Sequence, residues 1–222
     1  RPGRFAAAAL ALALDEAGIS REGDVIPVRP HEATGDREWI LLARHRTALP
    51  RVLGIMLKES QNMYAEAVIK TIGAEAGKTG GWEEGLDQVA KVLRDLHFPD
   101  ETCELADGSG MSRKNRLSPA LICRILASVD SSDEGDLFRS LLARAGRDGT
   151  LEGRLDKSPY RESIRAKTGY LRRVGALSGY ARSRNGLRTA FSVLINDFTH
   201  GGNYAMKRIE DRIVRAVVDH AE

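Results

Sequence analysis

The stretch SIRAKTGYLRRVGALSGYARSRNGLRTAFSVLI, residues 163–195, decides the fold of this chain. Apolar and polar residues alternate in three runs, which predicts strands at Ser163–Thr168, Val174–Ala181 and Leu187–Ile195. The Asn185-Gly186 dipeptide between the last two runs favours a tight hairpin in which both turn residues have positive φ. The sequence therefore predicts an antiparallel meander in its last third.

Helical patterns surround this meander. Residues 49–57 and 64–72 each carry an apolar stripe at helical spacing, and the break between the two stripes falls at Ser60. The other expected elements are an opening helix that ends at Gly18, strands at Asp24–Arg29 and Glu38–Arg44, helices at Trp82–Leu96, Pro119–Ala127 and Asp136–Arg144, and a terminal helix with Met206, Ile209, Ile213 and Val217 facing inward. We therefore expect one α+β domain over residues 1–222, an antiparallel sheet flanked by helices.

The bulk composition excludes several classes of function. Charged residues make up 29% of the chain, the formal net charge is +3, and no basic stripe is present. Nucleic-acid binding is therefore not expected, and the small cluster of Arg182, Arg184 and Arg188 is interpreted as a solvated face. The apolar run Phe5–Leu14 is too short to span a bilayer and lacks a cleavage pattern, so no transmembrane segment is expected in this chain.

No metal, nucleotide or other cofactor is expected. Cys103 and Cys123 lack the spacing of metal ligands, and whether they form a disulfide stays open. Lys78-Thr79-Gly80 comes close to a phosphate-binding loop. However, Gly73 and Gly77 have three residues between them where that loop has four, and no strand precedes them.

Short polar motifs supply the candidate functional residues. Lys167-Thr168-Gly169 ends the first strand of the meander, where the lysine would place positive charge beside a cleft and the glycine would let a ligand approach the strand edge. A surface strand that ends in a turn would have the same sequence. Ser60-Gln61-Asn62 lies at the break between two helices, where it could simply cap the second helix. Asp107-Gly108-Ser109-Gly110 is interpreted as a turn that Asp107 orders.

In their order and spacing, these motifs resemble one family. They are Ser60-Gln61-Asn62, the run Asp107–Arg113, Asn115-Arg116 with Ser118-Pro119, and Lys167-Thr168-Gly169 followed by Leu177-Ser178-Gly179-Tyr180. Over nearly its whole length the chain is similar to the D-alanyl-D-alanine carboxypeptidases/endopeptidases of the low-molecular-mass, class C penicillin-binding type. The related set S-x-x-K, S-D-N and K-T-G follows the same catalytic logic. The resemblance implies a penicillin-binding or β-lactamase-like transpeptidase domain.

One member of that set is missing from this chain. None of its eight lysines has a serine three residues before it, so the chain contains no Ser-x-x-Lys motif. In the family this motif lies well upstream, and inserted domains separate it from the rest of the transpeptidase domain. The resemblance therefore implies that this chain is the C-terminal part of the catalytic domain. It would need the upstream segment of the same protein as a partner and would be inactive alone.

The resemblance also assigns catalytic roles. An upstream serine, activated by its lysine, would attack the penultimate carbonyl of a peptidoglycan peptide ending in D-Ala-D-Ala, or the ring carbonyl of a β-lactam antibiotic. Ser60 would relay a proton toward the leaving amine, and Lys167 would keep Ser60 polarised. Asn62 would donate a hydrogen bond to a substrate amide carbonyl.

The substrate-binding residues implied by the resemblance follow Lys167. Thr168 would contact the terminal carboxylate, backbone groups beyond Gly169 would pair with the substrate as an added strand, and the N–H of Tyr170 would complete the oxyanion hole. The family usually has a small hydroxyl residue at the position of Tyr170, so carboxylate recognition differs here. Alternation sends Lys167 and Thr168 to opposite faces of the strand, and both can serve one site only if the cleft opens at the strand's edge.

Three functions remain open on the sequence. The first is part of a serine carboxypeptidase/endopeptidase that acts on peptidoglycan in the periplasm or outside the cell. The second is a β-lactamase or esterase on the same scaffold. The third is a noncatalytic cell-wall binding protein whose upstream serine has been lost.

Overall fold

The computed structural model describes residues 2–24, 44–77, 79–95 and 103–220. The chain divides into two compact units, residues 1–46 and 47–222. The first unit contains α1 (Pro2–Glu16), which ends two residues before the expected Gly18, where φ is +73°. The strands expected at Asp24–Arg29 and Glu38–Arg44 fall on residues 25–43, outside the described residues. The single domain over residues 1–222 stays a prediction.

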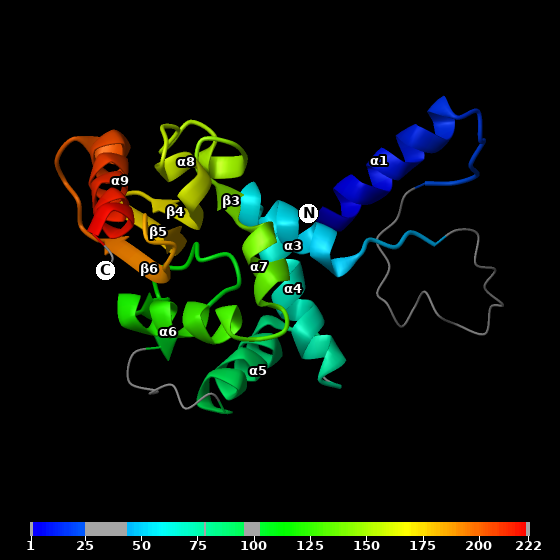
Figure 1. Ribbon diagram of the computed structural model, residues 1–222. Coiled ribbons are helices and arrows are strands. Elements are labelled where there is room, and N and C mark those ends of the chain that lie inside the picture. The colour runs from blue at the N-terminus through cyan, green and yellow to red at the C-terminus, as the bar shows by residue number, and fades with distance from the viewer. Residues whose placement is uncertain (1, 25–43, 78, 96–102, 221–222) are drawn as a thin grey trace. The chain divides into compact units, whose positions relative to one another are not determined.

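The second unit carries the predicted longer helices and the three predicted strands of the meander, together with short elements that the sequence pattern did not predict (Figure 1). Its elements are α3 (Leu49–Lys58), α4 (Asn62–Glu75), α5 (Trp82–Asp95), β1 (Cys103–Glu104), β2 (Arg116–Leu117), α6 (Pro119–Asp130), α7 (Gly135–Leu141), β3 (Ala143–Arg144), η2 (Gly149–Leu151), α8 (Tyr160–Ser163), β4 (Ile164–Leu171), β5 (Val174–Arg182), β6 (Arg188–Ile195) and α9 (Gly202–His220). The short elements that were not predicted are β1, β2, β3, η2 and α8. Among the described residues, none of the helices has both the length and the apolar character needed to cross a membrane.

The predicted meander is confirmed as a four-stranded antiparallel sheet with the order β3-β4-β5-β6. The short β3 covers only the start of β4, because Ala143 pairs with Ala166 and Arg144 pairs with Arg165. Within the part of the chain that the structure describes, β4 pairs with β5 alone from Lys167 to Leu171. Among these residues, no strand covers the other edge of β4 at the Lys-Thr-Gly motif.

Three details of the sequence prediction are wrong. The expected helix Asp136–Arg144 ends at Leu141, and Arg144 lies in β3. The expected two-residue hairpin turn at Asn185-Gly186 is also wrong, since Gly186 has φ of +88° but Asn185 is not in the left-handed region. The connection is longer than two residues, because the N–H of Ser183 bonds the carbonyl of Leu187 at 2.9 Å.

The third correction concerns the inward face of α9. Its buried side chains are Met206, Glu210, Val214 and Val218, whereas Ile209 and Ile213 are 38% and 43% exposed. A buried glutamate was not expected from the apolar periodicity. Its charge is compensated by Arg154, whose Nη2 lies 2.8 Å from Glu210 Oε2 and 2.7 Å from Asp211 Oδ1. This ion-pair cluster ties the loop after η2 to α9.

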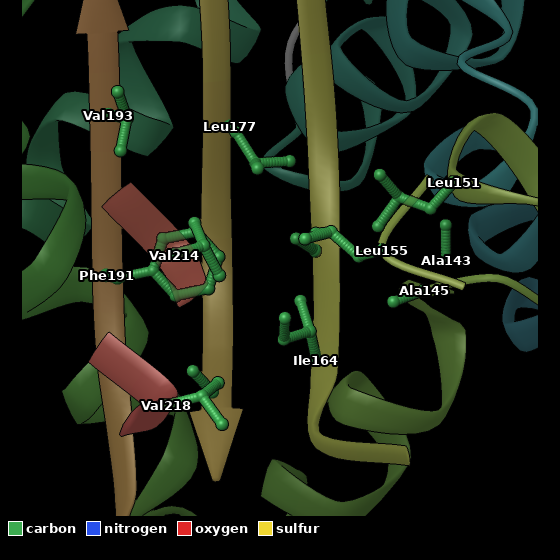
Figure 2. Close-up of a cluster of buried hydrophobic side chains, with 12 residues drawn as sticks. Ala143, Ala145, Leu151, Leu155, Ile164, Leu177, Phe191, Val193, Val214 and Val218 are labelled. Atoms are coloured by element: carbon green, nitrogen blue, oxygen red, sulfur yellow. The ribbon is translucent and has the colours of Figure 1, made fainter. Parts of the chain in front are cut away.

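Strand alternation divides the core between the two faces of the sheet. On one face, Val214 and Val218 of α9 pack against Ile164, Leu177 and Phe191 (Figure 2). On the opposite face, Tyr180 packs with side chains of α3, α6 and α7, namely Leu57, Leu126, Ile122 and Phe138. Arg165 and Lys167 are offset by one residue from the buried Ile164 and Ala166, so they face the helices α3 and α7. The sheet thus carries Lys167 on the side where α3 ends.

The contact between α4 and α5 depends on glycine. A Cβ built on Gly85 would lie 2.0 Å from the carbonyl oxygen of Ile69. The two helices approach so closely that no side chain fits at that position. This packing fixes the middle of α4 against α5.

We expect Gly85→Ala to lower the free energy of unfolding by about 1–3 kcal/mol, because overpacking outweighs the better helix propensity of alanine. Chemical denaturation of both variants measures it. Gly153→Ala is the matched control, since a Cβ there meets nothing within 4 Å. An equal effect of both substitutions would contradict the close-packing explanation.

Candidate active site

The Ser60 motif forms a tight turn rather than a helix cap. α3 ends at Lys58, α4 begins at Asn62, and Ser60 between them has φ of +56°. A non-glycine residue in the left-handed region carries backbone strain that the surroundings must support. The N-cap of α4 is Gln61, which makes no side-chain cap hydrogen bond. The capping alternative is therefore wrong, and the turn directs the Ser60 hydroxyl toward β4.

Lys167 meets this hydroxyl from the sheet. Its Nζ donates to Ser60 Oγ at 2.7 Å and to the carbonyl oxygen of Thr168 at 2.7 Å. Both partners are neutral. Burial disfavours the charged ammonium and lowers the pKa of Lys167 from 10.5 to about 8. The structure thus places a lysine whose charge is easily removed in direct contact with a serine hydroxyl.

The turn is held against the sheet by the carboxylate of Asp148, a residue the sequence analysis did not single out. Asp148 Oδ2 accepts from Lys58 Nζ at 3.1 Å and from Arg144 Nε at 2.9 Å, and Oδ1 accepts from the Arg144 N–H at 2.8 Å. Burial raises the pKa of this carboxyl, but the hydrogen bonds from Arg144 and Lys58 outweigh burial and lower it below 3.8. Gly149 allows the close approach, since a Cβ there would lie 2.5 Å from the Lys58 carbonyl oxygen.

Thr150 is a second residue that sequence reasoning missed. Thr168 Oγ1 donates to Thr150 Oγ1 at 2.8 Å, and Thr150 lies in η2 beside the open edge of β4. Two hydroxyls from segments 18 residues apart therefore lie together next to the Lys167–Ser60 pair. Nothing in the tripeptide Asp148-Gly149-Thr150 distinguishes it from an ordinary turn, so no sequence signal would have found it.

The remaining candidate residues border this pair without a side-chain hydrogen bond to it. Asn62 is the first residue of α4, with an exposed side chain, and Tyr170 is 56% exposed near the end of β4. A Cβ on Gly169 would lie 3.1 Å from Ala176 Cβ of the neighbouring strand. Glycine at this position therefore relieves crowding within the sheet, in addition to leaving the strand open.

The glycine-rich loop is ordered from within by Asp107, as predicted. Its carboxylate accepts from the N–H groups of Gly110 at 2.8 Å and Ser112 at 2.6 Å, and from Asn115 Nδ2 at 2.8 Å. Glu66 of α4 holds the same loop from outside by accepting the Ser109 N–H at 3.0 Å. Asp107 has its acceptor positions occupied by this loop, which suits a structural role.

The polar groups at the site are hydroxyls, one amine and backbone amides. No cluster of three or more His, Cys, Asp or Glu side chains that could hold a metal ion occurs in the part of the chain that the structure describes. Cys103 and Cys123 form no disulfide bond. A lysine–serine pair beside an open strand edge can transfer protons and bind an extended peptide, which is the chemistry of serine acyl-transfer domains.

The comparison with protein families agrees with this site. The pattern of the D-Ala-D-Ala carboxypeptidase 3 (S13) family matches residues 1–219, and the chain belongs to this family. The fold and the family resemblance expected from the motifs are thereby confirmed.

Two curated relatives illustrate the similarity. The chain is 31% identical over 219 residues to a D-alanyl-D-alanine carboxypeptidase of Actinomadura sp. (strain R39), covering 94% of this chain and 39% of the relative. It is 29% identical over 202 residues to the D-alanyl-D-alanine carboxypeptidase DacB of Haemophilus influenzae, covering 89% of this chain and 41% of the relative. The chain thus spans about two fifths of the length of these relatives.

Solved structures show the same fold. Penicillin binding protein 4 of Haemophilus influenzae, in complex with a β-lactam, superimposes with a TM-score of 0.80 at 27% identity, covering 97% of this chain and 51% of that one. A class A β-lactamase from Bacteroides cellulosilyticus superimposes with a TM-score of 0.57 at 18% identity, covering 93% and 78% of the two chains. The second match is informative for the α+β fold alone.

We expect Lys167 to titrate near pH 8, because burial has lowered its pKa to about 8. Below pH 8 the folded protein carries the full cost of the buried charge, and this cost disappears as the pH rises toward 10.5. Stability relative to Lys167→Met should therefore increase between these two values. NMR of isotopically labelled lysines measures the titration, and Lys167→Arg identifies the resonance. A resonance that titrates only above pH 10 would contradict the prediction.

Proposed function

We propose that residues 1–222 supply part of the catalytic domain of a serine D-Ala-D-Ala carboxypeptidase/endopeptidase. The observation that carries the proposal is the 2.7 Å contact between Lys167 Nζ and Ser60 Oγ beside the uncovered edge of β4. Family membership supports the substrate class, a peptidoglycan stem peptide, and the name of the structural relative supports binding of β-lactams. Such a substrate lies outside the cytoplasmic membrane, so the proposed location is periplasmic or extracellular.

The nucleophile would come from a Ser-x-x-Lys segment outside residues 1–222, since no lysine of this chain follows a serine at that spacing. The hydroxyl oxygen of that serine forms a bond to the penultimate carbonyl carbon, and the C–N bond to the last D-alanine breaks. The serine proton reaches the leaving amine through Ser60 Oγ, which the Lys167 ammonium holds in place by donating to it. Water then hydrolyses the acyl-enzyme. This chain alone is inactive in this scheme.

Substrate binding would use the edge of β4. Backbone groups from Gly169 onward are not covered by β3 and can pair with an extended peptide, and the N–H of Tyr170 is the proposed oxyanion donor. Thr168 is the proposed carboxylate ligand, and Asn62 the proposed donor to a substrate amide carbonyl. Thr150 adds a hydroxyl beside Thr168, in a chain that has Tyr170 where a small hydroxyl residue would be usual.

Intact-mass spectrometry after treatment with penicillin tests the proposal. The longer protein, carrying residues 1–222 with a Ser-x-x-Lys segment, should gain one adduct on the serine of that segment, and residues 1–222 alone should gain none. Ser60→Ala should slow acylation about 100-fold or more, because general acid–base catalysis typically contributes this much. Ser132→Ala is the matched control, since among the described residues its hydroxyl bonds the Val129 carbonyl and no other group.

The same experiment distinguishes the alternatives. A stable adduct on the longer protein supports the carboxypeptidase/endopeptidase. No adduct on either protein overturns the proposal in favour of a noncatalytic cell-wall binding protein. An adduct that forms and is released within seconds, with hydrolysed penicillin accumulating, points to a β-lactamase.

We expect Thr150→Val to impair recognition of a free terminal carboxylate. The substitution keeps the shape and removes a hydroxyl that accepts from Thr168 and would itself donate to the substrate carboxylate. The value of kcat/KM for a D-Ala-D-Ala peptide should therefore fall about tenfold, the equivalent of one lost hydrogen bond to a charged group. The same peptide with an amidated C-terminus should be affected much less. Steady-state kinetics of the longer protein measures both, with Thr71→Val as control because that hydroxyl bonds only the Ala67 carbonyl of its own helix. An equal loss with both peptides would contradict this role.

A further inference from the structure

An arginine-lined cavity lies at the start of β4, next to α8 and the turn that follows β3. Its volume is about 260 Å³. The residues that line it are Arg144, Arg147, Arg161, Glu162, Ile164 and Arg165. Four arginines against one glutamate give the lining a formal charge of +3, which is as large as the formal net charge of the whole chain.

Most of these guanidinium groups have N–H donors that form no hydrogen bond to another described residue. Arg144 is paired with Asp148 through its Nε. Arg165 Nη1 donates to the carbonyl oxygen of Arg139 at 3.4 Å. Within the described residues, no carboxylate lies within ion-pair distance of Arg147, Arg161 or Arg165. Five N–H donors on each side chain are therefore mostly left to solvent or to a ligand.

The cluster is held together against its own repulsion. Burial lowers the pKa of Arg165, the neighbouring Arg144, Arg139 and Arg147 lower it further, and Asp148 acts in the opposite direction. Arg144 and Arg165 are direct partners in the β3–β4 ladder, where like charges opposite each other are destabilising. An anion in the cavity would remove this repulsion, and a ligand that binds only the folded state stabilises it.

We propose that this cavity binds a multiply charged oxyanion of the phosphate type. A guanidinium group pairs with phosphate through two parallel hydrogen bonds, and several guanidinium groups around one recess can each take a different pair of oxygens. A single carboxylate would compensate one arginine and leave the others unpaired. Glu162 opposes the ligand, but it is exposed and outnumbered.

This binding site goes beyond the proposed acyl transfer and does not rest on it. Arg165 precedes Lys167 by two residues on the same face of β4, yet the two environments differ. The carboxylate of Asp148 forms an ion pair with a residue of each region, Arg144 of the cavity and Lys58 beside the Ser60 turn. Anion binding can therefore be measured on the full 222-residue chain without a Ser-x-x-Lys segment and without any turnover.

Isothermal titration calorimetry with inorganic pyrophosphate and with inorganic phosphate tests the proposal, at constant ionic strength and with acetate as comparison. We expect saturable one-to-one binding of the phosphates. The double variant Arg147→Gln/Arg161→Gln should raise the Kd for pyrophosphate at least about tenfold, the equivalent of one lost hydrogen bond between charged groups. Both side chains are exposed, so their loss leaves the fold intact. Arg212→Gln, an exposed arginine of α9, is the control for net charge.

Each outcome is decisive. No saturable binding, binding that the double variant leaves unchanged, or equal loss in Arg212→Gln overturns the proposal. Acetate that binds as tightly as pyrophosphate also overturns it, because the ligand class would then be wrong. Vesicles that contain phosphatidylglycerol distinguish the source of the phosphate group. If the chain sediments with these vesicles and the double variant does not, the ligand is a lipid headgroup. If the chain binds inorganic phosphates but does not sediment with the vesicles, the ligand is a soluble or terminal phosphate.

Discussion

The candidate active site depends on one carboxylate, that of Asp148, which joins two segments that the chain brings together from far apart. Lys58 and Asp148 are separated by 90 residues, and their ion pair fixes the end of α3 against the turn after β3. Ser60 follows Lys58 by two residues, so this ion pair, together with the packing of Leu57 against the cluster around Tyr180, helps to hold the Ser60 hydroxyl within reach of Lys167. The hydrogen bonds that lower the pKa of Asp148 stabilise the fold above about pH 4, the ordinary range of this carboxyl, and are lost as the pH falls through the lower folded value.

Lys167 has the opposite electrostatic situation. Its ammonium is buried against a hydroxyl and a carbonyl, and no carboxylate among the described residues forms an ion pair with it, so burial lowers the pKa of Lys167. A carboxylate at this position would stabilise the fold but would fix the lysine in its charged form and would repel a substrate carboxylate. A neutral partner leaves the ammonium both available for an anionic group and close to its own titration. The buried charge of Lys167 lowers the stability of the fold, and lysines with a shifted pKa are common at functional sites.

Local patterns were enough to predict most of the elements, but not the contacts between distant segments. The alternation in residues 163–195 predicts the sheet, and the phase break at Ser60 predicts the turn, because each signal lies within a few residues. Asp148 and Thr150 escaped prediction because their partners are 90 and 18 residues away, and the tripeptide that contains them looks like any turn. Glu210 escaped for the same reason: its burial follows from Arg154, which no helical periodicity reveals. The roles of Ser60, Asn62 and Lys167 came from the family resemblance, since each motif alone had an equally good structural explanation.

The two polar regions of β4, around Arg165 and around Lys167, are close in sequence but differ in their electrostatic environment. The lowered pKa of Lys167 has burial as its cause, whereas Arg165 is also affected by Arg144, Arg139 and Arg147. The carboxylate of Asp148 forms an ion pair with Arg144 on one side and with Lys58 on the other. One strand therefore carries a buried lysine with a lowered pKa and, two residues earlier, a strongly basic recess. An anion in that recess would relieve the repulsion between Arg144 and Arg165, which lie opposite each other in the β3–β4 ladder.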